Sequence, residues 1–421
     1  MTYEEALSLI ENINKTFCKP GTERVSALCH ALGDPQKELP IIHITGTNGK
    51  GSVLAMLESI FVKAGYKTGV FSSPAVLDFC EQIRIAGKPI PKDMLVSLLE
   101  QVIPHLDGMQ DKPTSFELLT ALAYTCFQRE KCDLVLIETG LGGLYDATNI
   151  IDAPLLSIIT TVALDHTGFL GETVSEIATH KAGIIKENAP VLYGGRSEDA
   201  LAVIRAAAKE KKAPLYTVLH HALSVSAYTI RGTVMAYKQR KELRLSLLGT
   251  YQPHNAATVL EAVDIIKNKG YHIPEDAIRE GLAHTVWHAR MELLSQDPIV
   301  IYDGAHNPAG IRVAIESIRA YFGEKKVILL SGVLRDKDYT EIVSALAAIA
   351  CEVHTVSPRS PRALSAEDYA ACFRKIGVPA VPYSSYEQAV TAAQASARRQ
   401  SCPLICLGSL YLYQDIAPFV R

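Results

Sequence analysis

Short apolar runs alternate along the chain with longer stretches of helical periodicity. Each run is rich in β-branched residues and is bounded by turn residues, which is typical of a buried strand. The strands predicted in this way lie at 40–45, 133–138, 154–162, 299–303, 326–332 and 403–409. Because stretches between them, such as 53–63 and 339–349, have helical periodicity, the pattern predicts an α/β fold with a parallel sheet covered on both faces.

Residues 215–248 depart from this alternation. They read as short alternating strands with a turn at Arg231 and Gly232, which predicts a small antiparallel patch appended to the first domain. The following segment, YQPHNAATVLEAVDIIKNKG, is predicted to form a helix that is entered through Pro253 and ended by Gly270.

The length of 421 residues suits two domains rather than one compact core. Around 289–298 a short connection precedes a second α/β series. We therefore predict an N-terminal domain at 1–293, which carries the parallel sheet and the antiparallel patch, and a C-terminal Rossmann-like α/β domain at 294–421.

Composition and charge exclude several classes of protein. The formal net charge of -3 gives no reason to expect a nucleic-acid partner. The N-terminus lacks the pattern of a signal peptide, and no apolar run reaches the roughly 20 residues that span a bilayer, so we expect no membrane partner and a cytoplasmic location. The nine cysteines, Cys18 among them, include no CxxC pair, which favours reduced and mostly buried thiols over a zinc site or disulfides.

The segment HITGTNGKGSV at 43–53 carries the strongest chemical signal. A predicted strand leads into small residues whose amides can converge on phosphate oxygens, and the helix that follows adds a favourable dipole. Lys50 would bridge the terminal phosphates, but Gly51 comes next, and the hydroxyl that usually holds Mg²⁺ arrives one place late at Ser52. We therefore predict a P-loop in the N-terminal domain, with magnesium held from elsewhere. The loop residues expected to bind ATP are Gly46, Thr47, Asn48, Gly49, Lys50, Gly51 and Ser52.

Three other predicted strands end in polar residues. FSSP places Ser73 after one strand, DLVLIE ends in Glu138, and Asp165 and His166 follow the strand at 154–162. Because the carboxyl ends of parallel strands meet at one edge of the sheet, these side chains are expected beside the loop. A carboxylate there suits Mg²⁺, which prefers oxygen ligands, and Ser73 could supply the missing hydroxyl. Taken alone, a Ser-Ser-Pro turn or a single histidine is an ordinary turn feature.

Several blocks of the sequence together resemble one family. They are GTNGKGS, SSP, ETGLGGLYDATN, DHTGFLG, HKAGI, YQPHNAATVL, YDGAHNP, DKD and GSLYL. In this order they resemble the folylpolyglutamate synthase and dihydrofolate synthase family of ATP-dependent amide ligases, relatives of the Mur ligases. The resemblance spans nearly the whole chain, and several blocks at once are more specific than any single motif. It implies a P-loop ATPase and folate-binding domain followed by a glutamate-ligase domain, with ATP between them.

The resemblance also implies roles for individual residues. The expected metal ligands are Ser73, Glu138, His166 and Lys181, the last of which carries a carbamate in many relatives. The expected catalytic residues are Lys50, His166, Lys181 and Arg290. Further contacts to ATP are expected from Asn255, Arg290 and Asp303. Contacts to folate or glutamate are expected from Phe116, Glu117 and His306.

The implied reaction forms an amide at the expense of ATP. ATP phosphorylates a carboxylate of the pteroate or folate, and the amine of L-glutamate attacks the resulting acyl phosphate, which releases ADP and phosphate. No side-chain nucleophile is needed, because catalysis consists of charge neutralisation by Lys50, Arg290 and Mg²⁺ together with alignment of the reactants. The expected cofactors are ATP and two Mg²⁺ ions, the expected partners are small molecules, and a monomer is expected.

Some segments depart from the family pattern. Ala75 and Gln82 stand where the usual serine loop has a histidine and an arginine, and Leu144 stands where an arginine follows GLGG. The usual Pro-Gly-Arg is His-Ala-Arg at 288–290, which keeps the arginine. The ATP and metal residues are thus intact, whereas the loop that borders the expected folate pocket is altered.

Three alternatives remain open. The altered loop from Ala75 to Gln82 would suit a Mur-like ligase that joins an amino acid to a different carboxylate. A P-loop NTPase switch explains Lys50 but gives no role to DHTGFLG, HKAGI or DGAHNP. A non-catalytic folate-binding protein gives no purpose to Lys50, Glu138 and His166. Among the ligase activities, the sequence does not distinguish addition of the first glutamate from extension of a polyglutamate chain.

Overall fold

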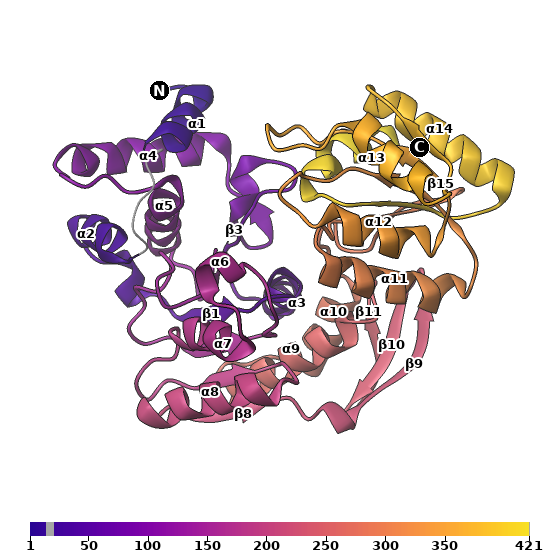
Figure 1. Cartoon of the computed structure of the whole chain (residues 1–421). Coiled ribbons are helices and arrows are strands. Elements are labelled where there is room, and N and C mark those ends of the chain that lie inside the picture. The colour runs from indigo at the N-terminus through magenta and orange to yellow at the C-terminus, as the bar shows by residue number, and fades with distance from the viewer. Residues whose placement is uncertain (14–20, 421) are drawn as a thin grey trace. The chain divides into compact units, whose positions relative to one another are not determined.

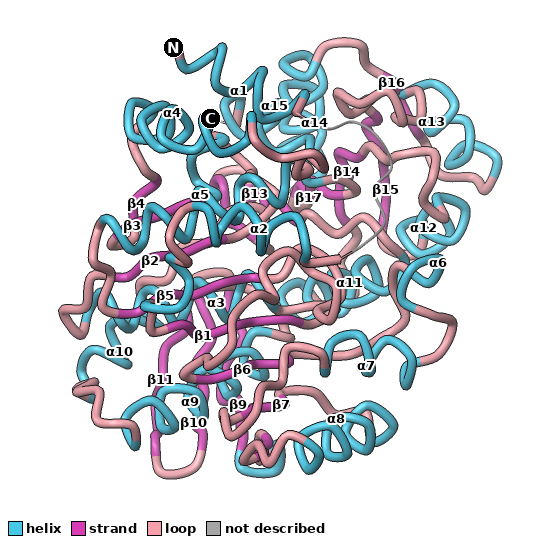
Figure 2. Tube along the Cα trace, turned by 90° about the vertical axis from the view of Figure 1, so that its left-hand side faces the viewer, coloured by secondary structure: helices cyan, strands magenta, loops and turns pink. Residues whose placement is uncertain are grey.

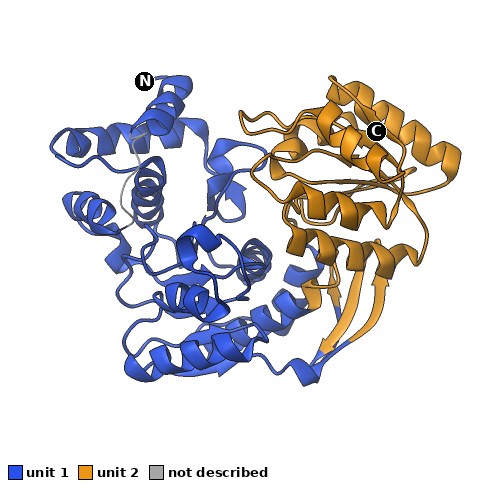
Figure 3. Cartoon of the chain, viewed as in Figure 1, with its two compact units in different colours: residues 1–224, 237–243, 254–285 blue, residues 225–236, 244–253, 286–421 orange. Residues whose placement is uncertain are grey.

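The computed structural model describes residues 1–13 and 21–420, so Cys18 lies outside the described residues. The chain forms two compact units (Figure 3). Unit 1 comprises residues 1–224, 237–243 and 254–285, and unit 2 comprises residues 225–236, 244–253 and 286–421. Residues 286–293, which the sequence pattern assigned to the first domain, are grouped with unit 2.

Unit 1 is built on an eight-stranded sheet in the order β4-β3-β2-β5-β1-β6-β7-β8. The strands are β1 (Ile41–Thr45), β2 (Thr68–Phe71), β3 (Ile83–Ile85), β4 (Lys88–Pro89), β5 (Leu134–Glu138), β6 (Leu156–Ile159), β7 (Val191–Tyr193) and β8 (Leu215–Thr217). Strands β2, β5, β1, β6, β7 and β8 run parallel, and β3 and β4 extend one edge antiparallel; Figure 2 shows β4 to β7 in this order. The predicted parallel sheet is confirmed, and β8, which the pattern placed in the antiparallel patch, is its last strand.

Helices surround this sheet (Figure 1), and its inner strands β2, β5, β1, β6 and β7 are buried, whereas the end strands β4 and β8 are largely exposed. Their bounds are α1 (Tyr3–Asn12), α2 (Glu23–Ala31), α3 (Lys50–Lys63), α4 (Lys92–Asp107), α5 (Ser115–Arg129), α6 (Thr167–Leu170), α7 (Val174–Ala182), α8 (Glu198–Glu210), α9 (Gln252–Asn268) and α10 (Glu275–Ala283), with 3₁₀ turns η1 (Pro35–Glu38), η2 (Phe79–Gln82) and η3 (His220–Ala222). One hydrophobic core joins α1, α2, α4 and α5 to β1, β2 and β5. Another joins α7 and α8 to β6 and β7, while α3 contacts β1, β2 and β5.

Capping boxes fix the first residues of helices α5 and α7. Thr114 Oγ1 accepts a hydrogen bond from Glu117 N (3.3 Å), and the Glu117 carboxylate accepts one from Thr114 N (2.7 Å), so α5 begins with two backbone donors satisfied. Thr173 and Glu176 form the same arrangement at the start of α7. Local sequence therefore fixes where both helices begin.

A small three-stranded sheet has the order β11-β10-β9. Its strands are β9 (Leu223–Thr229), β10 (Gly232–Tyr237) and β11 (Arg240–Leu245), joined by two short turns. The first turn contains Ile230 and Arg231, where the sequence predicted it. The residues of this sheet are divided between the two units.

Unit 2 carries a six-stranded sheet in the order β12-β13-β17-β14-β15-β16. The strands are β12 (Glu292–Gln296), β13 (Ile299–Asp303), β14 (Val327–Ser331), β15 (Ala350–Thr355), β16 (Ala380–Pro382) and β17 (Leu404–Leu407). The helices are α11 (Pro308–Phe322), α12 (Tyr339–Ala347), α13 (Ala366–Lys375), α14 (Tyr386–Gln400) and α15 (Tyr413–Ile416), with 3₁₀ turns η4 (Leu410–Leu412) and η5 (Ala417–Phe419). All neighbouring strands are parallel except β12 and β13, so the expected Rossmann-like α/β domain is confirmed.

The segment predicted as a short connection, 289–298, contains strand β12, which pairs antiparallel with β13. Most of its residues are only partly buried because it lies at the edge of the sheet. It therefore lacks the continuous apolar run that marks the central strands.

Among the helices of the described residues, none combines the length and apolarity needed to cross a membrane.

Candidate active site

The phosphate-loop residues lie between β1 and α3, and the helix begins at Lys50 itself. Gly49 has φ +88° and Gly46 has φ +157°. A side chain at Gly46 would come within 1.8 Å of Thr160 Oγ1, and one at Gly49 within 2.6 Å of Asn255 Oδ1. Both positions therefore need glycine, and Asn255 on α9 lies directly beside the loop as its expected role requires.

The segment that follows β6 holds the loop in shape. Thr161 O accepts from Thr47 N (2.7 Å), Thr161 Oγ1 accepts from Asn48 N (3.1 Å), and Thr160 Oγ1 donates to Asn48 O (2.7 Å). Lys50 Nζ donates to Gly46 O across the loop (3.0 Å). The lysine ammonium is thus positioned at the mouth of a preformed turn at a helix N-terminus, which is a favourable place for phosphate.

The expected metal ligands of strand ends share one edge of the sheet. Ile44 pairs with Glu138, the last residue of β5, and Phe71 at the end of β2 pairs with Ile137. Ser73 follows β2, and His166 lies in the segment after β6, which pairs with the other side of β1. The structure therefore brings Ser73, Glu138 and His166 to the edge that carries the phosphate loop.

These residues suit a magnesium ion in their chemistry. Glu138 is buried, whereas His166 has φ +50° and a half-exposed ring. Within residues 1–13 and 21–420, no group of three His, Cys, Asp or Glu side chains is arranged to hold a metal, and the expected set contains only two residues of these types. A carboxylate and a hydroxyl are oxygen donors of the kind that Mg²⁺ prefers, so Glu138 and Ser73 fit this ion.

Lys181, near the end of α7, is buried with 3% of its surface exposed. Burial and the neighbouring charge of Lys50 together lower the pKa of its ammonium to about 7, although Asp165 and Asp146 oppose the change. Lys181 therefore shares its electrostatic environment with Lys50 of the phosphate loop.

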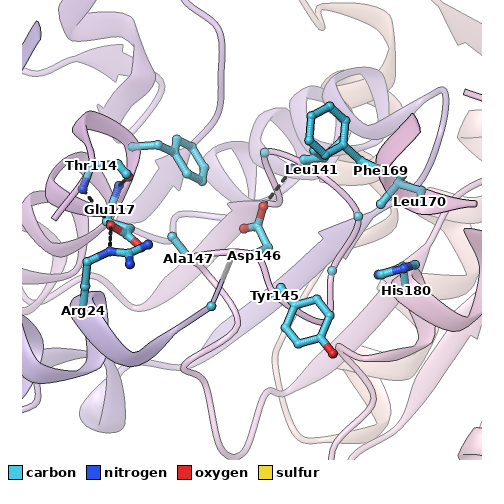
Figure 4. Close-up of a pocket in the computed structure, with 15 residues that line it drawn as sticks. Arg24, Thr114, Glu117, Leu141, Tyr145, Asp146, Ala147, Phe169, Leu170 and His180 are labelled. Atoms are coloured by element: carbon cyan, nitrogen blue, oxygen red, sulfur yellow. Dashed lines mark hydrogen bonds and ion pairs between the residues drawn. The ribbon is translucent and has the colours of Figure 1, made fainter. Parts of the chain in front are cut away.

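Unit 1 contains a cavity of about 380 Å³ beside the edge of the sheet at which β5 ends (Figure 4). Its walls come from α2, α5, the GLGG segment, α6 and α7. The lining residues are Gly21, Arg24, Thr114, Phe116, Glu117, Gly140, Leu141, Gly142, Gly143, Tyr145, Asp146, Ala147, Phe169, Leu170 and His180. The expected substrate residues Phe116 and Glu117 thus lie in one cavity of a size that takes a small molecule.

The Glu117 carboxylate is already engaged within the cavity wall. Arg24 Nε and Nη2 each donate to one of its oxygens over 2.9 Å (Figure 4). Arg24 Nη1 also lies 3.3 Å from Asp111 Oδ2. Because Thr114 N also bonds to it, Glu117 is placed to orient Arg24 and the start of α5.

Sequence reasoning missed several cavity residues. Arg24 lies on α2, far from any recognised motif, and only its long-range pairing with Glu117 reveals it. Asp146 had a signal, because it follows a buried strand and a glycine turn within ETGLGGLYDATN. Burial raises the pKa of the Asp146 carboxyl, and hydrogen bonds from the Leu141 and Thr148 amides oppose that rise. Tyr145 and Phe169 are exposed aromatic residues at the cavity wall.

The altered serine loop is ordered by its own side chains. Gln82, which replaces the family's arginine, is buried and donates to Phe79 O (3.3 Å). Glu81 accepts hydrogen bonds from the amides of Val76 and Leu77, and Leu77 is exposed. The Gln82 side chain therefore hydrogen-bonds to the backbone of its own loop, and it lacks the positive charge of the arginine usual in the family.

In unit 2, three expected site residues gather at the carboxyl end of β13. Asp303 is buried and accepts hydrogen bonds from Met291 N and Ala305 N, both at 2.8 Å. Burial raises the pKa of its carboxyl, and the nearby guanidinium of Arg290 opposes that rise. His306 Nδ1 lies 2.9 Å from Gly304 O. Arg290, Asp303 and His306 therefore form one polar cluster at the carboxyl end of a central strand.

The changed residue before Arg290 has a backbone explanation. Ala289 has φ +57°, a left-handed conformation that favours glycine, and its carbonyl accepts from Gly304 N (2.8 Å). The glycine usual in the family suits this geometry, and here alanine adopts it at a cost of about 1 kcal/mol.

Comparison with known proteins gives matches over both units. Residues 44–263 match the family model of the Mur ligase middle domain, and residues 289–409 match that of the Mur ligase, glutamate ligase domain. The dihydrofolate synthase/folylpolyglutamate synthase of Bacillus subtilis is 37% identical, with 87% of each chain covered. The folylpolyglutamate synthase of Lacticaseibacillus casei is 34% identical, with 98% of this chain and 97% of the relative covered.

Solved structures agree with these sequence matches. Escherichia coli FolC, solved in complex with DHPP and ADP, is 30% identical and superposes with a TM-score of 0.87, covering 99% of this chain and 96% of the other. The expected two-part α/β architecture therefore extends over the whole chain.

Proposed function

Since the chain belongs to the folylpolyglutamate synthase and dihydrofolate synthase family of Mur-type, ATP-dependent carboxylate–amine ligases, we propose that its unit 1 cavity holds the folate-type acceptor. The observation that supports this proposal is that neighbouring residues of α7 contact both the cavity and the surroundings of the phosphate loop. His180 lines the cavity, and the next residue, Lys181, interacts electrostatically with Lys50 of the phosphate loop. An acceptor in the cavity would therefore end next to the terminal phosphate of ATP.

The walls suit a flat heterocycle with hydrogen-bond donors. Phe116, Tyr145 and Phe169 offer aromatic faces, and the Asp146 carboxylate can accept from ring N–H groups such as those of a pterin. Arg24 adds a fixed cation, because Glu117 holds its guanidinium in place.

The proposed reaction needs no covalent attachment to the protein. A carboxylate oxygen of the acceptor attacks the γ-phosphorus of ATP, and ADP leaves. The amine nitrogen of L-glutamate then attacks the acyl carbon, phosphate leaves, and the nitrogen loses a proton as the amide forms. Lys50 stabilises the charge of the transferring phosphoryl group, and its position at the start of α3 adds the helix dipole.

Magnesium held by Ser73, Glu138, His166 and a carbamate on Lys181 would neutralise further phosphate charge. In unit 2, Arg290 and Asp303 are proposed for ATP and His306 for glutamate, and these roles rest on the family resemblance. The count of two Mg²⁺ ions, the carbamate, the monomeric state and the cytoplasmic location stay predictions.

The proposal is tested by ADP release from the purified chain with Mg-ATP and L-glutamate. Parallel reactions contain dihydropteroate, tetrahydrofolate or no acceptor. Turnover that needs both glutamate and a pterin acceptor is expected, and the ratio between the two acceptors separates the dihydrofolate synthase activity from chain extension. ADP release without an acceptor would favour an NTPase. No ADP release with either pterin would favour a ligase that uses a different carboxylate as its acceptor, as the altered loop from Ala75 to Gln82 would suit.

A further inference from the structure

A buried chain of polar side chains runs from the centre of the unit 1 sheet to the cavity wall. It starts at His43 in the middle of β1, which is fully buried, and passes through Thr148 to Asp146. His43 Nε2 lies 2.8 Å from Thr148 Oγ1, which donates to Asp146 Oδ1 over 2.5 Å. We infer that His43 and Thr148 are positioning residues, which fix the Asp146 carboxylate in the orientation that meets the acceptor. This inference rests on the proposed function, because it requires the cavity to be the acceptor site.

The direction of these hydrogen bonds follows from counting protons. The Thr148 hydroxyl has one proton to donate, and an ionised carboxylate only accepts. Thr148 therefore donates to Asp146 and accepts from His43, which places the imidazole proton on Nε2. Nδ1 of His43 has no hydrogen-bond partner in the described part of the chain, as suits a ring nitrogen without a proton, because a buried unpaired N–H is costly.

Backbone groups complete the arrangement around the carboxylate. Asp146 Oδ2 accepts from Leu141 N (2.8 Å; Figure 4), and Oδ1 accepts from Thr148 N (3.0 Å) as well as from the hydroxyl. Thr148 is itself held, since Tyr124 Oη donates to its carbonyl (2.8 Å). Asp146 is therefore held on both oxygens, and the Thr148 hydroxyl ties it to a rigid strand of the sheet.

The hydrogen-bonded chain from His43 through Thr148 to Asp146 should affect the binding of one substrate, the acceptor. Asp146 lines the acceptor cavity, whereas the phosphate loop has its own supports at Thr160 and Thr161. Freeing the carboxylate should weaken recognition of the acceptor and leave recognition of ATP and glutamate unchanged. A loss of general fold stability would instead lower the amount of active enzyme, which reduces the apparent kcat and leaves the KM of every substrate unchanged.

The test compares Thr148→Val with Thr148→Ser in the full chain. Valine keeps the shape but removes the hydroxyl, whereas serine keeps it. Thr125→Val is the matched control, because Thr125 is also buried and its hydroxyl donates to Ala121 O within α5. We expect Thr148→Val to raise KM for dihydropteroate about tenfold and to leave KM for ATP and glutamate within about twofold. Thr148→Ser and Thr125→Val should both resemble the wild type.

Two results would overturn the inference. One is an unchanged KM for dihydropteroate in Thr148→Val, and the other is an equal rise in KM for all three substrates. An inactive wild type would overturn the proposed function itself, which is a different outcome. Should Thr148→Val fail to fold, nitrogen-15 NMR of the wild-type histidines decides, with His43 assigned by comparison with His43→Gln: a proton on Nε2 is expected, and a proton on Nδ1 contradicts the inference.

Discussion

Arg24 on α2 holds Glu117 on α5 through two parallel hydrogen bonds, Nε to Oε2 and Nη2 to Oε1, each 2.9 Å long. Both side chains are largely buried, with 12% and 5% of their surfaces exposed. Because Glu117 also caps α5, one carboxylate joins the two helices that form this wall of the cavity. Glu117 therefore shapes the acceptor site through the arginine that it orients.

Replacing Glu117 by glutamine should break this pair and remove the buried carboxylate that faces Arg24, whereas the Asp111 carboxylate near Arg24 is largely exposed. We expect the free energy of unfolding to fall by about 3 kcal/mol and KM for the acceptor to rise, both measurable by denaturant titration and steady-state kinetics. Glu176→Gln is the matched control, because Glu176 closes the same kind of capping box at α7 but lies at the exposed surface. Its cost should stay near 1 kcal/mol, and equal losses in the two variants would contradict the role assigned to Arg24.

Lys50 should act on the reaction rather than on the fold. Lys50→Met is expected to reduce kcat about 100- to 1000-fold, because the developing charge on the phosphoryl group loses its nearest cation. Lys63→Met removes a lysine from the other end of the same helix, where it is exposed, and should leave kcat unchanged. ADP release by the two variants at equal protein concentration makes the comparison, and similar rates would refute the phosphate-loop assignment.

His43 should make stability depend on pH in a defined window. Burial lowers its pKa from 6.5 to about 3, so between these values the unfolded chain binds a proton that the folded chain does not. Unfolding free energy therefore falls as the pH is lowered through this window, by about 2 kcal/mol between pH 7 and pH 5 from this group alone.

The matched measurement is the difference between wild type and His43→Gln, which subtracts other groups that titrate nearby, including Asp146 and Lys186. Glutamine does not titrate, so the variant should lose less stability over this range. Parallel pH profiles for the two proteins would mean that His43 is not held neutral in the folded state.

Lys181 should carry the carbamate if the metal set is as proposed. Protein equilibrated with carbon-13 bicarbonate is expected to show a carbamate resonance, and Lys181→Arg should abolish it together with most of the activity. Lys186→Arg is the control, because Lys186 is another partly buried lysine, bonded to Asn149 O. A resonance that survives in Lys181→Arg, or that is missing from the wild type, would remove the carbamate from the account.

Features that depend on neighbouring residues in the sequence were predictable. The strand, glycine turn and lysine from Ile41 to Lys50 are contiguous, and the parallel sheet brings Ser73 and Glu138 to the same edge by topology alone. Buried strands such as β14 were also predictable, because their residues form a continuous apolar run.

Features that depend on distant side-chain pairing were not predictable. Arg24 acquires its place only through Glu117, and His43 reads as one polar residue within an apolar strand until Thr148 is seen beside it. β12 was missed because an edge strand needs no continuous apolar run. The burial of Lys181 likewise results from packing that its own helix does not specify.

The most direct test of the central claim follows the oxygen atoms. The acceptor is prepared with oxygen-18 in its carboxylate and converted with ATP and L-glutamate, and the released inorganic phosphate is examined by mass spectrometry. An acyl phosphate requires one labelled oxygen to pass to phosphate for each amide formed, and this is the result we predict. Unlabelled phosphate, with ADP formed at the same rate, would show that ATP is hydrolysed by water and would contradict the ligase mechanism.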